Sequence, residues 1–134
     1  LQDRVTLTGG LPHEEVIARM ARSDLFVLPS WGEGYGIVYI EAMAAGCIAV
    51  GAENEGIADT ITDGENGFLV EPGDAPRLAD AVNRVLQDPG RAQRLAEAAW
   101  AEARRQLDVE IHAARKLEAI RALAALSPRT PGPA

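Results

Sequence analysis

Short apolar runs alternate with amphipathic segments along the first half of the chain. Nearly continuous apolar runs at residues 24–30, 47–52 and 67–70, together with VTLT at residues 5–8, predict four short strands. Runs without polar alternation are typical of strands that are buried on both faces of a parallel sheet. Segments of helical composition lie between most of these runs. The resulting β-α-β-α-β order predicts a parallel, doubly wound α/β unit.

Two helices are expected between these strands. The first covers residues 12–23, with Pro12 suited to a first helical position and two glutamates in the first turn. Its apolar stripe is formed by Val16, Ile17 and Met20. The second covers residues 36–46 and is expected to end at Gly46, a residue that readily adopts a left-handed cap.

The second half of the chain predicts helices only, because no further strand pattern follows residue 74. Asp74 and Asp88 are expected N-caps with a proline in the first turn, and Asp108 is the expected cap of a third helix. The apolar face of the first of these helices comprises Leu78, Val82, Val85 and Leu86. Residues 127–134 are expected to be a disordered tail, so the predicted domain spans residues 1–126.

Composition narrows the classes of partner. A chain of 134 residues with 47% hydrophobic residues fits one domain with a core. Its formal charge of −7 argues against nucleic acid or an anionic membrane surface as the main partner. Cys47 is the only cysteine, which excludes an internal disulfide and favours a cytoplasmic location. We expect Cys47 to be a core residue, and no metal ligand set is predicted, since His13 and His112 lie far from it.

The carboxyl end of the strand at residues 24–30 is a candidate ligand site. Open α/β sheets bind ligands at this end, and Gly34 and Gly36 let the backbone approach a ligand closely. The amides of Gly36, Ile37 and Val38 are expected at a helix N-terminus, which carries a positive partial charge and unpaired donors. Phosphate is the usual occupant of such a site.

Two carboxylates, Glu33 and Glu41, flank this expected anion site within WGEGYGIVYIEAMAAG, residues 31–46. Glu41 lies in an apolar run, where a carboxylate is costly to bury without a polar partner. As an acceptor it can take both hydroxyls of a ribose diol, while Glu33 lies beside the group attached to the phosphate. The stretch therefore predicts a clamp for a nucleotide diphosphate. The alternative is a turn that serves packing only, with Glu41 as a cap or paired with an arginine.

Residues 28–74, LPSWGEGYGIVYIEAMAAGCIAVGAENEGIADTITDGENGFLVEPGD, resemble the donor-binding half of the group 1 glycosyltransferases. These are retaining, nucleotide-sugar-dependent enzymes of the GT-B fold, whose motif of two glutamates separated by seven residues is matched by Glu33 and Glu41. The resemblance extends from residue 3 to about residue 105. It implies a Rossmann-like parallel sheet of about four strands, an incomplete GT-B C-terminal half, followed by C-terminal helices.

The resemblance also implies roles for individual residues. Glu33 would be the catalytic residue beside the anomeric carbon of the transferred sugar. The implied donor-binding residues are Gly34, Tyr35, Gly36, Ile37, Val38 and Glu41. Glu41 would hold the ribose of a UDP- or GDP-sugar, with no metal and no cofactor. The segment ENEG, residues 53–56, departs from the double glycine common in the family, which leaves its role open. Trp31 either walls the sugar pocket or covers the strand end. Tyr35 is also open to two interpretations, and packing is the favoured one because the family usually has Phe at this position.

Similar enzymes build this half from six strands in the order 3-2-1-4-5-6, and this chain would begin at the third. The first two strands, an Arg and Lys pair that binds the diphosphate, and the acceptor-binding N-terminal domain would all be missing. We expect the strand at residues 5–8 to pair beside residues 24–30 or across a homodimer, and any peripheral membrane contact to require the missing domain. The alternative functions are a non-catalytic nucleotide-binding module and a generic α/β interaction domain.

Overall fold

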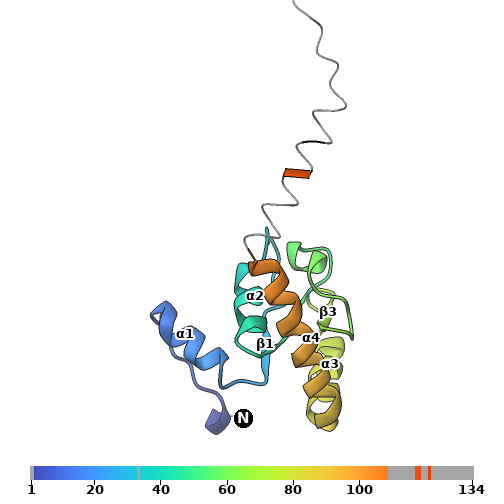
Figure 1. The fold of residues 1–134 in the computed structure, drawn as a ribbon. Coiled ribbons are helices and arrows are strands. Elements are labelled where there is room, and N and C mark those ends of the chain that lie inside the picture. Colours follow the sequence, from blue (N-terminus) through green and yellow to red (C-terminus); the bar gives the residue numbers. More distant parts are fainter. Residues whose placement is uncertain (1, 33, 109–116, 119–120, 122–134) are drawn as a thin grey trace, which may run out of the picture.

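The computed structural model describes residues 2–32, 34–108, 117–118 and 121 (Figure 1). Three strands alternate with helices, and two longer helices follow. In chain order the elements are η1 (Gln2–Arg4), α1 (His13–Met20), β1 (Leu25–Val27), α2 (Ile37–Ala44), β2 (Ile48–Ala52), η2 (Gly56–Asp59), β3 (Gly67–Val70), α3 (Ala75–Gln87) and α4 (Pro89–Leu107). The elements η1 and η2 are short 3₁₀ helices.

The three strands form one parallel sheet in the order β1-β2-β3. Leu25 lies opposite Ile48 at the start of one ladder, and Ala49 lies opposite Gly67 in the next. All five residues of β2 are buried, as the apolar run at residues 47–52 predicts for a central strand. The prediction of a parallel α/β unit is therefore confirmed.

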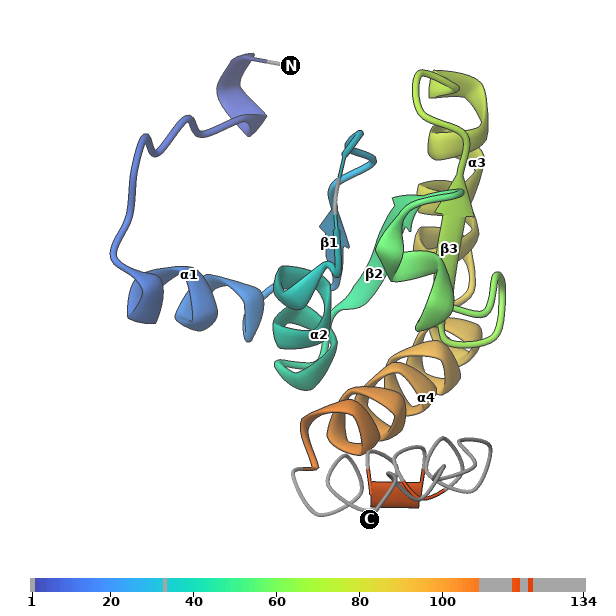
Figure 2. The ribbon, with the colours of Figure 1, turned by 90° about the horizontal axis from the view of Figure 1, so that it is seen from above.

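Helices cover both faces of the sheet. On one face, Tyr39, Ile40 and Met43 of α2 pack with Ala49 and with Ala99 and Ala103 near the end of α4. On the other face, Ala81 and Val85 of α3 and Leu95 of α4 pack against Ile48, Val50, Phe68 and Val70. Figure 2 shows α4 passing from α3 to α2, so this helix ties the two layers together.

Helix α1 packs on the side of α2 and shares a cluster with Phe26 of the edge strand β1. Its apolar stripe of Val16, Ile17 and Met20 forms a cluster with Ala42 of α2 and with Cys47. Cys47 is 1% exposed, and burial raises the pKa of its thiol, with a further contribution from the Asp24 carboxylate. Its Sγ donates to the carbonyl of Met20 at 3.0 Å. The prediction of a core cysteine is confirmed, and its protonated thiol is a poor nucleophile.

The predicted strand at residues 5–8 is wrong, and so is its pairing beside residues 24–30. The segment forms no ladder, and Val5 and Leu7 are 62% and 94% exposed. Figure 2 shows this segment, in dark blue, away from the three strands. High β-propensity does not form a strand without a neighbour that satisfies its backbone groups. The described sheet therefore has three strands, not four, whereas pairing across a dimer stays a prediction.

Two burial predictions also need correction. Strand β1 covers only Leu25–Val27, and Val27 is 40% exposed, because β1 is an edge strand that pairs with β2 alone within the described residues. On α3, Leu86 is 64% exposed and does not join Val85 in the core. The neighbouring residues Leu78 and Val82 are half-buried.

The predicted helix ends agree closely with the structure. The Asp74 and Asp88 carboxylates each accept a hydrogen bond at 2.9 Å, from the amides of Arg77 and Arg91. Gly46 follows α2 with a φ of 100°, a left-handed value that favours glycine. The helix predicted from Asp108 and the predicted tail at residues 127–134 fall largely outside the described residues.

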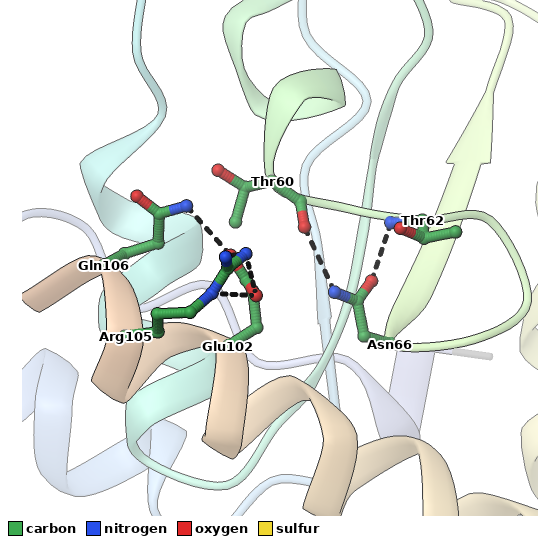
Figure 3. A network of polar contacts seen from close by, with 6 residues as sticks. All are labelled: Thr60, Thr62, Asn66, Glu102, Arg105 and Gln106. Carbon is green, nitrogen blue, oxygen red and sulfur yellow. Dashed lines mark hydrogen bonds and ion pairs between the residues drawn. The ribbon is translucent and has the colours of Figure 1, made fainter. Parts of the chain in front are cut away.

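The loop that leads into β3 is held by a buried amide. Asn66 accepts from the amide of Thr62 at 2.7 Å and donates to the carbonyl of Thr60 at 3.1 Å (Figure 3). Nearby on α4, Arg105 and Gln106 both donate to Glu102. Because both the carbonyl oxygen and the NH2 group of the Asn66 side chain form hydrogen bonds, this buried polar group is stabilising. It fixes the 60–66 turn and hence the position of β3.

Candidate functional site

The loop between β1 and α2 carries the candidate residues, and its end requires glycine. Gly36 is the N-cap of α2 and has φ 74° and ψ 39°, a left-handed conformation. A Cβ at this position would also lie 2.9 Å from Cδ2 of Tyr39 and 3.2 Å from Cβ of Ile57. Both the backbone conformation and the available space therefore exclude a larger residue.

Tyr39 fixes the start of α2 to the end of β1. Its side chain is fully buried, and its ring meets that of Phe26 edge to face with a centroid distance of 5.5 Å. Its hydroxyl donates a hydrogen bond to the carbonyl of Leu28. Sequence reasoning missed this role. The available signal was a tyrosine in an otherwise apolar helix, since a buried tyrosine hydroxyl needs a partner.

The loop after β2 supports the loop after β1. Oε1 of Glu55 accepts a hydrogen bond from the amide of Gly32 at 2.9 Å. A Cβ on Gly56 would lie 2.1 Å from the carbonyl oxygen of Gly34, so the two backbones are in direct contact. Asn54 has a φ of 63°, which asparagine tolerates better than most residues. The segment ENEG thus acts as a clamp on the glycine-rich loop.

The amino end of α2 lies at the carboxyl end of β1, as predicted. Ile37 and Val38 are its first two residues, and an α-helix contains no acceptor for its first amides. The first turn carries no acidic side chain that would neutralise the positive partial charge. The start of α2 therefore has the free amide donors and the positive partial charge of a helix N-terminus.

Large side chains around this helix end are exposed. Trp31, Tyr35 and Ile37 have exposed fractions of 76%, 52% and 60%. The expectation that Tyr35 serves packing is wrong for this structure, because its ring lies outside the core. Trp31 is likewise exposed, which argues against its covering the strand end. An open apolar rim of this kind is available to a ligand or to another protein surface.

Glu41 lies one turn into α2, and its side chain is 29% exposed. Its Oε1 lies 3.4 Å from Nε2 of His13, the first residue of α1. The carboxylate in the apolar run thus has a polar partner and partial access to solvent, which removes most of its burial cost. This partner is a histidine from another helix and was missed by sequence reasoning, which considered an arginine.

Glu33, the predicted catalytic residue, lies outside the described residues. The structure therefore brings together Gly34, Tyr35, Gly36, Ile37, Val38 and Glu41 around the start of α2 without placing Glu33. Among the described residues, no three histidine, cysteine, aspartate or glutamate side chains gather as a metal site would require. No helix in the same part of the chain is long and apolar enough to cross a bilayer.

Comparison with known proteins identifies the family. The family model for glycosyl transferases group 1 matches residues 1–101. A curated relative, 2-deoxystreptamine N-acetyl-D-glucosaminyltransferase of Niallia circulans, is 39% identical over 74 residues, which are 55% of this chain and 19% of that protein. The chain thus spans about a fifth of that relative's length.

Two solved structures agree with this match. Sucrose-phosphate synthase from Thermosynechococcus elongatus superposes with a TM-score of 0.76 at 34% identity, covering 93% of this chain and 31% of that one. Anabaena HepE in complex with UDP-glucose gives a TM-score of 0.67 at 30% identity, covering 78% of this chain and 29% of that one. The α/β fold and the matched length together show that the chain belongs to the group 1 glycosyl transferases.

Proposed function

We propose that this chain is the donor-binding part of a glycosyltransferase that moves a sugar from a nucleotide-diphosphate sugar to an acceptor. The observation that carries the proposal is the start of α2. The amides of Ile37 and Val38 come first at this helix end, and the partly exposed Glu41 carboxylate follows one turn later on the same helix. This arrangement supports a site for a diphosphate and its ribose. Anabaena HepE, a similar structure, is seen with UDP-glucose, which supports a nucleotide sugar as the ligand.

Each group in the site has a chemical task in this proposal. The amides of Ile37 and Val38 hold the diphosphate, and those of Tyr35 and Gly36 hold sugar hydroxyls, with Gly34 allowing close approach. Negative charge grows on the diphosphate as the sugar leaves, and preorganised donors stabilise such charge best. Glu41 accepts the two ribose hydroxyls. Glu33 acts beside the anomeric carbon.

Replacing Glu41 with glutamine tests the ribose assignment. In a full-length enzyme that contains this chain, we expect Glu41→Gln to weaken UDP or GDP binding by about 1.5–3 kcal/mol, the scale of hydrogen bonds to charged groups. Isothermal titration calorimetry measures the loss. Glu65→Gln is the matched control, because Glu65 is an exposed glutamate in a turn before β3. Equal affinity of the wild type and the Glu41 variant would remove the ribose assignment.

Metal independence is a second expected property. The sequence around the site offers no pair of aspartates suited to Mg²⁺ or Mn²⁺, so helix-end amides are expected to stabilise the diphosphate. Sugar transfer by the full-length enzyme should persist in excess EDTA. Activity that EDTA abolishes and Mg²⁺ restores would contradict this proposal.

The same titrations separate the alternatives. A non-catalytic nucleotide-binding module would bind UDP or GDP through Glu41 but would transfer no sugar in its full-length form. A generic interaction domain would show no saturable heat with either nucleotide.

A further inference from the structure

We propose that His13 is a positioning residue for Glu41 and thereby sets the preference of the site for a ribose over a deoxyribose. This inference rests on the proposed function, because it assigns a second residue to the same nucleotide site. It starts from the contact between Nε2 of His13 and Oε1 of Glu41 at 3.4 Å. The two residues are 28 positions apart and come from different helices.

The packing of α1 on α2 fixes where His13 lies. Val16 and Ile17 are one turn along α1, and they pack in one cluster with Val38 and Ala42 of α2. These α2 residues lie three positions before and one position after Glu41. A packed helix pair holds its register. The packing of α1 on α2, and not a mobile loop, therefore places the His13 ring beside the Glu41 carboxylate.

The chemistry of the pair suits a positioning role. A free glutamate side chain has many rotamers, and ordering it on ligand binding costs conformational entropy. The His13 imidazole lies within ion-pair distance of Oε1 and restrains the carboxylate before the ligand arrives, which lowers that cost. One contact with Oε1 still leaves acceptor capacity on the carboxylate for a diol. The His13 side chain is 68% exposed, so its own packing contributes little to the fold.

Positioning predicts a specific effect on nucleotide selectivity. Restraining Glu41 matters only for a ligand that offers hydroxyls to it, so the loss of His13 should weaken binding of a ribonucleotide more than binding of its 2′-deoxy analogue. A purely structural role would weaken both ligands equally.

The test compares UDP and GDP with their 2′-deoxy analogues on the isotope-labelled 134-residue chain, following the amide resonances of Gly36, Ile37 and Val38 by NMR. We expect His13→Leu to reduce the ribose preference about two- to fivefold, the scale of an exposed ion pair. His13→Gln keeps a donor of similar reach and should retain most of the preference. Arg19→Leu is the control, because Arg19 lies on the same helix and pairs with Glu15 at 2.9 Å.

A double variant makes the test sharper. If His13 acts through Glu41, then His13→Leu should change the ribose preference little when Glu41 is already glutamine. An unchanged preference in His13→Leu, or an equal loss for both ligands, would overturn the inference while leaving the proposed function intact. No saturable shift with either ribonucleotide in the wild type would overturn the proposed function, and the inference would fall with it.

Discussion

Replacing Gly56 with alanine should lower the free energy of unfolding by about 1–3 kcal/mol, the usual cost of forcing extra atoms into a packed site. The new Cβ would lie 2.1 Å from the carbonyl oxygen of Gly34 and 3.0 Å from Cα of Tyr35. Both atoms belong to backbone, so no side chain can rotate away, and the two loops must separate. Urea unfolding measures the loss.

The direction of the change in unfolding free energy distinguishes two effects of the Gly56→Ala substitution. Replacing glycine with alanine usually stabilises a protein by about 0.4–1 kcal/mol where the backbone conformation permits it, and Gly56 has no positive φ. A loss therefore reports the contact between the loops. Gly34→Ala is the matched control for stability, because a Cβ at Gly34 meets no atom within 4 Å. A Gly56→Ala variant as stable as the wild type would show that the loops do not need their close contact.

Sequence reasoning succeeded where local signals and burial agree. The run at residues 47–52 reads as a strand buried on both faces, and β2 is that strand. Asp74 and Asp88 combine a capping side chain with a proline in the next positions, and each caps its helix. These signals work because a cap or a buried strand is specified by a few consecutive residues.

Sequence reasoning failed where the structure of a segment depends on the elements that pack beside it. The run at residues 5–8 has strand composition but no partner, and Val27 ends a strand whose outer edge is unpaired in the described sheet. Leu86 lies on the predicted apolar face of α3, yet no neighbour covers it within the described residues. Strand propensity and an apolar face are tendencies that only a neighbouring element can fulfil.

In the candidate site, too, local features were predicted and long-range contacts were missed. The glycines and amides at the start of α2 were predicted from consecutive residues, and Gly36 is the N-cap of that helix in the structure. The supports were missed because each is a long-range contact. Glu55 reaches Gly32 across 23 positions, and His13 approaches Glu41 from another helix. Such contacts require the tertiary fold, which a single sequence does not display.

The 134-residue chain by itself should transfer no sugar, although it should retain weak nucleotide binding. Holding donor and acceptor together can supply about 7–11 kcal/mol of a reaction barrier, and the chain spans only about a fifth of the length of a curated relative. The site is also open, since Trp31, Tyr35 and Ile37 around it are more than half exposed. Water therefore reaches the groups that a closed enzyme would shield, which weakens their electrostatic effect.

The measurement is sugar transfer by the isolated chain with UDP-glucose and GDP-mannose as donors and a panel of sugar, polyol and lipid acceptors. The full-length enzyme serves as the positive control, and donor hydrolysis without protein sets the background. We expect product formation by the chain at the background rate, while amide resonances of Gly36, Ile37 and Val38 still shift with nucleotide. Transfer above background would show that this three-stranded unit holds an acceptor without help. The barrier reduction would then have to come from residues that the chain already contains.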